Sequence, residues 1–197
     1  MNETLKTIYE RRAVRKFKDK AVTKEIIEQL LDAGRMAPSA INRQPWKFYI
    51  VTKKEDIKLF SKEIGTAALK SIPQMGIKNI VKAAASSITH LSHGIDFLKA
   101  PDPVFHGAPV VIFITAEKDN EWAGLDIGMC TQNIMLAAKS LGLDSCPVGF
   151  GKFIMQAKSY SKLNIPAKEQ VLLAVIIGYR DESPEVHERK RDNVIYI

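Results

Sequence analysis

The alternation of hydrophobic and polar positions along the chain predicts two helices followed by strands and helices in turn. Apolar residues recur at helical spacing over 3–13 and 24–35, with Asn2 and Thr23 at the N-cap positions. Runs of β-branched and aromatic residues predict strands at 46–52, 109–115, 144–148 and 171–177. Further helices are predicted at 54–64, 121–141 and 153–163. This order indicates one α/β or α+β domain over residues 1–197.

Two segments do not fit this alternation. Residues 65–107 are divided by Pro73, Gly76, Gly94, Pro101, Pro103 and Gly107. A long irregular segment in a compact domain is typical of a lid or a substrate-binding loop, which is the interpretation we adopt for 65–107. The second segment, Val194–Ile197, is an apolar run after a polar loop. It predicts a strand that docks on another surface, such as a partner chain.

Charge adds a question about ligands. The 197 residues include 29 Lys and Arg against 22 Asp and Glu, a formal net charge of +7, and residues 1–24 hold a large part of the excess. This balance indicates an anionic partner: nucleic acid, a membrane surface or a phosphorylated small molecule. Aromatic residues are not interleaved with the basic run, as stacking on bases would require. With no signal peptide and no apolar run long enough for a membrane span, we expect a cytoplasmic protein that binds neither nucleic acid nor membrane.

Familiar catalytic motifs are missing. The chain has no P-loop, no GxGxxG after a strand, no HExxH and no GxSxG. Cys130 and Cys146 are read as buried small hydrophobes rather than as a redox pair. His90 and His93 lack nearby acidic or thiol partners, so no metal site is expected.

Two polar segments remain as candidates for chemistry. Arg11-Arg12-Ala13-Val14-Arg15 closes the first predicted helix, and guanidinium groups bind phosphate bidentately. The loop 38–46 places Ser, Asn and Gln between two prolines and runs directly into a strand. Amide side chains both donate and accept hydrogen bonds, which suits the edge of a planar heterocycle. Taken alone, each segment could equally be a solvated helix end or ordinary turn chemistry.

Together the two segments resemble the nitroreductase-like family of FMN-dependent oxidoreductases. Arg11-Arg12-x-x-Arg15-x-Phe17 is similar to its N-terminal signature, and Ala37-Pro38-Ser39-x-x-Asn42-x-Gln44-Pro45-Trp46 to its second. Further similarity lies in Gly107-Ala108-Pro109, Asp126-x-Gly128, Gln132-Asn133, Leu141-Gly142-Leu143 and Gly178-Tyr179. The matches keep the family's order outside 65–106. The chain departs from it at Ala13, where many relatives carry Ser or Thr.

The resemblance implies an α+β sandwich, with a central mixed sheet flanked by helices, in a domain-swapped homodimer with FMN at two interface sites. By this likeness Arg11, Arg12 and the Ala13 backbone hold the FMN phosphate, with Arg189 and Arg191. Arg15 approaches the pyrimidine edge, and the backbone at Val148 and Gly149 lies beside flavin N5. The loop residues that reach flavin from the other subunit are Pro38, Ser39, Ala40, Asn42 and Gln44.

The implied function is reduction of nitroaromatic, quinone or similar electron-poor acceptors by NAD(P)H in a ping-pong cycle, with hydride transfer carried by the flavin rather than by a catalytic side chain. Alternatives within the family are a flavin reductase, a dehydrogenase or a dehalogenase. A non-catalytic FMN-binding protein and a small basic nucleic-acid-binding module are the other hypotheses.

Overall fold

In this computed structural model, residues 1–71 and 101–197 are described. Their four strands form one antiparallel sheet in the order β1-β2-β4-β3. The strands are β1 (Lys47–Val51), β2 (Val110–Glu117), β3 (Asp144–Val148) and β4 (Glu169–Gly178). The α-helices are α1 (Glu3–Glu10), α2 (Lys24–Arg35), α3 (Lys54–Ser71) and α6 (Ala123–Ser140). The described residues also form three short 3-10 helices, η1 (Ala40–Asn42), η3 (Gly149–Gln156) and η4 (Lys158–Leu163).

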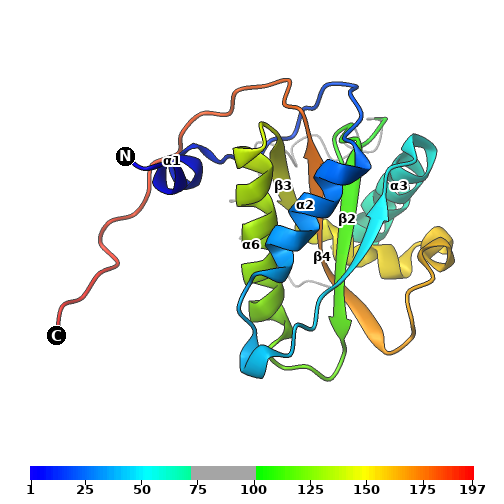
Figure 1. Cartoon of the computed structure of the whole chain (residues 1–197). Helices are drawn as coiled ribbons and strands as arrows, with labels where there is room; N and C mark the ends of the chain where they lie inside the picture. Colours follow the sequence, from blue (N-terminus) through cyan, green and yellow to red (C-terminus); the bar gives the residue numbers. More distant parts are fainter. Residues whose placement is uncertain (72–100) are drawn as a thin grey trace.

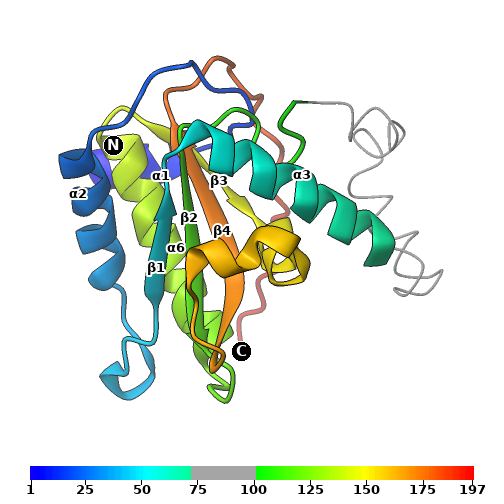
Figure 2. The same ribbon diagram turned by 90° about the vertical axis from the view of Figure 1, so that its right-hand side faces the viewer.

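Helices cover both faces of the sheet. Helices α2 and α6 lie on one face, and α3 with η3 and η4 lies on the other (Figures 1 and 2). Successive residues of β2 point to opposite faces, so Ile112 joins the core under α2 and α6 whereas Phe113 joins the core under α3. The central strands β2 and β4 are therefore apolar on both sides, which makes the fold an α+β sandwich.

Most predicted elements are present with shifted ends. Asn2 and Thr23 cap α1 and α2, accepting hydrogen bonds from Leu5 N at 2.9 Å and Ile26 N at 3.4 Å. The first helix stops at Glu10 rather than at residue 13, because Ala13 forms a bridge to Ser145 instead.

Three expectations are corrected. The described sheet is antiparallel rather than mixed, and Ala13–Ser145 is only an isolated parallel bridge. The helix predicted at 153–163 is two 3-10 helices that begin at Gly149, and Gly151 in the first of them approaches β4 closely at Ala174. Helix α3 continues to Ser71, since its buried stripe extends beyond Ile64 to Ala67 and Ala68.

The segment 65–107 is thus helical at its start, whereas residues 101–107 form bends and turns. Residues 65–71 belong to α3. Phe105 is fully buried and packs edge-on against Phe113 at 5.9 Å between ring centroids, so it is a core residue. The rest of the predicted lid, 72–100, lies outside the described residues, as do His90 and His93.

The C-terminal residues 181–197 leave the body of the chain as an extended segment on the side of α1 and α6 (Figure 1). Val194–Ile197 forms no strand within this chain, and its four side chains are exposed. Within the described ranges, no helix is long and apolar enough to cross a membrane.

Candidate functional site

Residues 11–18, called the arginine segment because they include Arg11, Arg12 and Arg15, cross the start of β3 and the end of β4. Val14 N donates to Ser145 O at 3.1 Å, Lys18 N donates to Tyr179 O at 2.8 Å, and Asp181 N donates to Lys16 O at 2.8 Å. Buried Val14 and Phe17 point into the core under α3. Backbone hydrogen bonds and two apolar side chains therefore fix this segment, which leaves its arginines on the outside.

The three arginines have different surroundings. The Arg12 guanidinium donates from Nη1 to the carbonyls of Tyr9 at 2.6 Å and Arg11 at 2.8 Å, which caps the end of α1. Among the described residues, no carboxylate pairs with the guanidinium of Arg11 or Arg15. Burial raises the pKa of the Cys146 thiol, and the positive charges of Arg15 and Arg11 partly offset this, so both guanidinium groups act on the same stretch of β3.

Glu182 adds a negative charge to this region. Its Oε1 accepts a hydrogen bond from Arg15 N at 2.5 Å. Farther along β3, Val148 is half-buried and Gly149 is exposed, with no described atom within 4 Å of the position a Cβ would take. Arg11, Ala13 and Arg15 thus belong to a segment that lies beside the start of β3, and the Val148–Gly149 backbone lies at the end of this strand. Their role toward FMN stays a prediction.

Side-chain hydrogen bonds add to two short backbone bonds in holding the loop 38–46. Gln44 N donates to Ser39 Oγ at 2.9 Å, and Gln44 Nε2 donates to Asn42 Oδ1 at 3.2 Å. Ala40 N donates to Asp126 Oδ1 at 3.1 Å. Asn42 and Gln44 are exposed, so the amide groups that the resemblance assigns to flavin face outward.

The structure does not bring the two segments together within one chain. The arginine segment lies at the end of the sheet where β4 finishes, and the loop 38–46 lies at the opposite end, next to the start of α6 (Figures 1 and 2). A ten-residue strand such as β4 spans roughly 30 Å. Arg189 and Arg191 lie in the exposed C-terminal segment, and their predicted role remains a prediction.

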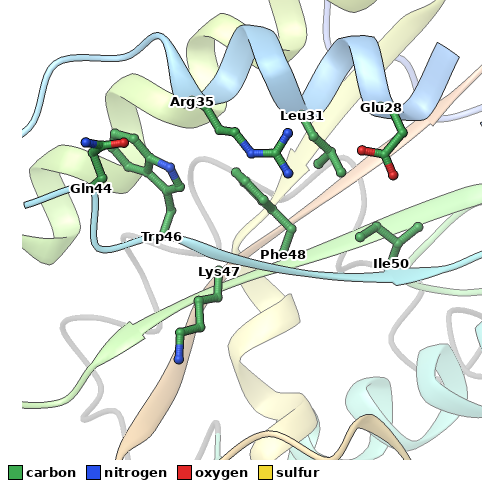
Figure 3. A pocket seen from close by; sticks show the side chains of 8 residues that line it. All are labelled: Glu28, Leu31, Arg35, Gln44, Trp46, Lys47, Phe48 and Ile50. Atoms are coloured by element: carbon green, nitrogen blue, oxygen red, sulfur yellow. The ribbon is translucent and has the colours of Figure 1, made fainter. Parts of the chain in front are cut away.

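A groove of about 500 Å³ lies between α2 and β1 (Figure 3). Its lining residues are Glu28, Leu31, Arg35, Gln44, Trp46, Lys47, Phe48 and Ile50. The Arg35 guanidinium stands over the Phe48 ring, 5.8 Å from its centroid. Gln44 alone among the predicted site residues reaches this groove, which follows the outer edge of β1 rather than the arginine segment.

A buried polar cluster lies just beyond the loop, where β1 begins. The Glu169 carboxylate accepts hydrogen bonds from Lys47 Nζ at 2.5 Å, Thr115 Oγ1 at 2.7 Å and Tyr49 Oη at 3.0 Å. Burial acts to raise the pKa of Glu169, but these three donors outweigh it and leave the pKa below its usual value. Burial and the neighbouring carboxylate raise the pKa of Tyr49 to about 12.

Both cysteines fit a packing role. Cys130 and Cys146 are buried, and burial raises the pKa of Cys130 to about 12, which fits the packing interpretation. The described residues contain no cluster of three His, Cys, Asp or Glu side chains suited to a metal ion. Sequence reasoning did not anticipate the contacts of Asp126, Glu169 or Glu182, because each partner is distant along the chain.

Known proteins share this α+β sandwich. A nitroreductase with bound FMN from Desulfitobacterium hafniense DCB-2 superimposes with a TM-score of 0.80 at 26% identity, covering 100% of this chain and 99% of that chain. The nitrobenzene nitroreductase of Ectopseudomonas oleovorans is 30% identical over 202 residues, 89% of this chain and 86% of that protein. The 4-nitrobenzoate reductase of Pseudomonas putida is 27% identical over 197 residues, 90% of this chain and 85% of that protein.

These likenesses define the class, and a family model identifies it more closely. The model described as "Nitroreductase family" matches residues 8–179, most of the chain. The chain therefore belongs to the nitroreductase family.

Proposed function

We propose that the chain is an FMN-dependent oxidoreductase that uses NAD(P)H to reduce nitroaromatic, quinone or similar electron-poor acceptors. The observation that carries the proposal is the arginine segment fixed on β3, with Arg11 and Arg15 unpaired by carboxylates among the described residues. Relatives named as reductases of nitrobenzene and 4-nitrobenzoate support the acceptor class.

The residues present fit FMN. A phosphate dianion needs fixed cations and backbone donors, and Arg11, Arg12 and the Ala13 N–H supply both at one place. By the family likeness, Arg15 would add positive charge near the pyrimidine edge of a bound flavin, which gains electron density on reduction. Gly149 presents backbone without a side chain, which permits a planar ring to approach. When bound, FMN supplies the redox chemistry, taking hydride from NAD(P)H and passing it to the acceptor.

The separation of the two segments supports a homodimer. One chain places the loop 38–46 at the far end of the sheet from the arginine segment (Figures 1 and 2). In a two-fold dimer the loop of one chain can lie beside the arginine segment of the other, so each FMN is held by both chains. Exposed apolar residues on α1 and α6 fit a partner surface: Leu5, Ile8, Tyr9, Trp122 and Leu125.

The exchanged element is the C-terminal segment. Among the described strands β1 pairs only with β2, which leaves its outer edge open. A short apolar strand such as Val194–Ile197 of a second copy can add to that edge and cover the groove beside Phe48. This arrangement gives the exposed tail a partner and closes the sheet edge.

The first experiment asks whether purified protein carries or takes up FMN. We expect visible flavin absorbance, bleaching by NADH or NADPH under anaerobic conditions, and reoxidation by a nitroaromatic or a quinone. A colourless protein that cannot be reconstituted with FMN would contradict the proposal. Bound and reducible FMN without turnover would instead indicate a non-catalytic flavoprotein.

A second experiment tests the shared site. One chain carries Arg11→Ala and the other carries Ser39→Ala, Asn42→Ala and Gln44→Ala, and each homodimer is expected to bind FMN weakly. The mixed dimer has one intact site and should bind about half the wild-type amount of FMN. Light scattering should give twice the 22.0 kDa chain mass for the whole protein and a lower mass after deletion of Val194–Ile197. Weak binding by the mixed dimer would show that each site lies within one chain.

A further inference from the structure

Asp126 is a buried acid whose one described hydrogen bond goes to the loop 38–46. It lies in the first turn of α6 and is 1% exposed. Its Oδ1 accepts from Ala40 N at 3.1 Å, whereas its Oδ2 has no partner among the described residues. A carboxylate is costly to bury, and one with an unpartnered oxygen is more costly still. The one described hydrogen bond of Asp126 offsets only part of this cost, so the residue contributes little net stability to the folded chain.

The loop that Asp126 contacts has an unfavourable backbone. Ile41, Asn42 and Gln44 have φ values of 47°, 55° and 48°, in the left-handed region that residues with a Cβ rarely adopt. The Ile41 side chain is 86% exposed, so burial of this side chain does not compensate for its conformation. Non-glycine residues keep such a conformation only where surrounding contacts impose it, most often at functional sites.

Several contacts impose this conformation, among them two backbone hydrogen bonds within the loop, from Asn42 N to Ser39 O at 3.0 Å and from Arg43 N to Ala40 O at 3.1 Å. The others involve side chains. Two of them, Ser39 Oγ to Gln44 N and Asn42 Oδ1 to Gln44 Nε2, lie within the loop and cannot fix it relative to the body of the protein. The hydrogen bond from Ala40 N to Asp126 is the described side-chain bond that ties the loop to α6.

We infer that Asp126 is a positioning residue for FMN: it holds the loop in the strained conformation that presents Asn42 and Gln44 to the cofactor. This inference rests on the proposed function. Asp126 acts through the loop and needs no contact with the cofactor. A group kept for positioning costs stability in the free protein and strengthens binding, whereas a purely structural group would mainly support folding.

Three variants separate these roles. Asp126→Ala removes the acceptor, and Asp126→Asn keeps an amide oxygen in its place. Thr131→Val is the matched control, because Thr131 lies on the same helix, is 2% exposed and has an unpartnered hydroxyl. The measurements are the FMN dissociation constant, the melting temperature of the apoprotein and the rate at which trypsin cuts the apoprotein after exposed Arg43.

We expect Asp126→Ala to weaken FMN binding about tenfold or more and to speed cleavage after Arg43, with the apoprotein melting temperature nearly unchanged. Asp126→Asn should bind FMN within about threefold of wild type, and Thr131→Val should match wild type in all three measurements. Equal FMN affinity in Asp126→Ala and wild type would overturn the inference. So would weak binding in both Asp126 variants with a matching loss of apoprotein stability.

The two proposals fail in distinguishable ways. If wild-type protein binds no FMN, the proposed function fails, but the trypsin measurement on the apoprotein still shows whether Asp126 holds the loop. If wild type binds FMN and Asp126→Ala leaves both affinity and cleavage unchanged, only the role of Asp126 is refuted.

Discussion

The two ends of β4 are held by different kinds of contact. At the Glu169 end a buried carboxylate joins β1, β2 and β4 through three side-chain hydrogen bonds. At the Gly178 end the arginine segment pairs with the sheet through backbone hydrogen bonds, and the ring of Phe17 lies against Gly178. The carboxylate of Glu182 adds one side-chain bond there, from Arg15 N. The loop 38–46 adjoins the first end and the arginine segment adjoins the second, so each predicted half of the FMN site is held differently.

This difference predicts where substitutions matter. A segment held by its backbone keeps its position when most of its side chains change, so its function is lost only through the ligating groups themselves or through a steric clash. A loop held by side chains is loosened by single substitutions that never touch a ligand.

The largest effect is expected at Glu169. Glu169→Ala leaves the hydroxyls of Tyr49 and Thr115 without their acceptor, which should lower the free energy of unfolding by about 3 kcal/mol. Glu117 is the control. It is the register partner of Glu169 on the neighbouring strand β2, but its carboxylate forms an ion pair with Lys168 at the exposed surface. Glu117→Ala should change stability by less than about 0.5 kcal/mol in urea titrations. Equal losses in the two variants would argue against the buried cluster as the anchor.

The same cluster gives a pH dependence with a definite sign. The pKa of Glu169 in the folded protein lies below its ordinary value of 4.5, so its contribution to stability is present above that pH and is lost as the pH falls through the folded pKa. Tyr49 acts in the opposite direction: its pKa is raised from 10.0 to about 12, so its contribution is present below pH 10.0 and is lost as the pH rises toward 12. In urea titrations across this pH range, Glu169→Gln should flatten the acid limb. It should also weaken the alkaline limb, because the Glu169 carboxylate is one cause of the raised pKa of Tyr49.

The second prediction concerns the ligating groups at the other end. Arg11→Ala should weaken FMN binding by about 2 kcal/mol, roughly thirtyfold, since a charge-assisted phosphate contact is lost. Lys18→Ala removes the same charge from the same segment but leaves the Lys18 N–H bond to Tyr179 intact, and it should bind FMN nearly as wild type. Matching losses in both variants, measured by fluorescence titration, would indicate a general charge effect instead of a phosphate ligand.

A steric change at the same end should have an intermediate effect. A Cβ at Gly178 would lie 2.6 Å from Pro109 Cδ and 2.9 Å from Phe17 Cδ1. Gly178→Ala should therefore lower the free energy of unfolding by about 1.5 kcal/mol and displace Phe17, with weaker FMN binding as a consequence. At Gly124 on α6 no described atom lies within 4 Å of the added Cβ, so Gly124→Ala should be neutral or slightly stabilising.

The sequence predicted the elements better than their ends. Caps at Asn2 and Thr23 and the apolar run of β2 are local signals, and they appear where the pattern placed them. The end of α1 and the 3-10 character of η3 depend on pairing with β3 and close approach to β4, which no local pattern encodes. The antiparallel sheet follows from strand partners that are distant in sequence.

For the site, the sequence predicts roles for the arginines and the loop amides because they form compact motifs, and these roles stay predictions. The acids that hold those motifs were missed for the opposite reason. Asp126 and Ala40 are 86 positions apart, and Glu182 and Arg15 are 167 positions apart. A lone acid in a sequence gives no sign of whether it will be buried beside a distant backbone N–H, so only the folded chain shows these contacts.

The smallest predicted effect is the most direct comparison of the two ends, and it uses two serines. Ser39→Ala removes the acceptor for Gln44 N and should weaken FMN binding about threefold, near 0.7 kcal/mol, because the loop loses an internal side-chain bond. Ser145 holds the arginine segment through its backbone carbonyl, and its own hydroxyl is unpartnered among the described residues. Ser145→Ala should therefore leave the FMN dissociation constant unchanged. If the two variants bind FMN equally well, the proposed difference between side-chain and backbone support is wrong.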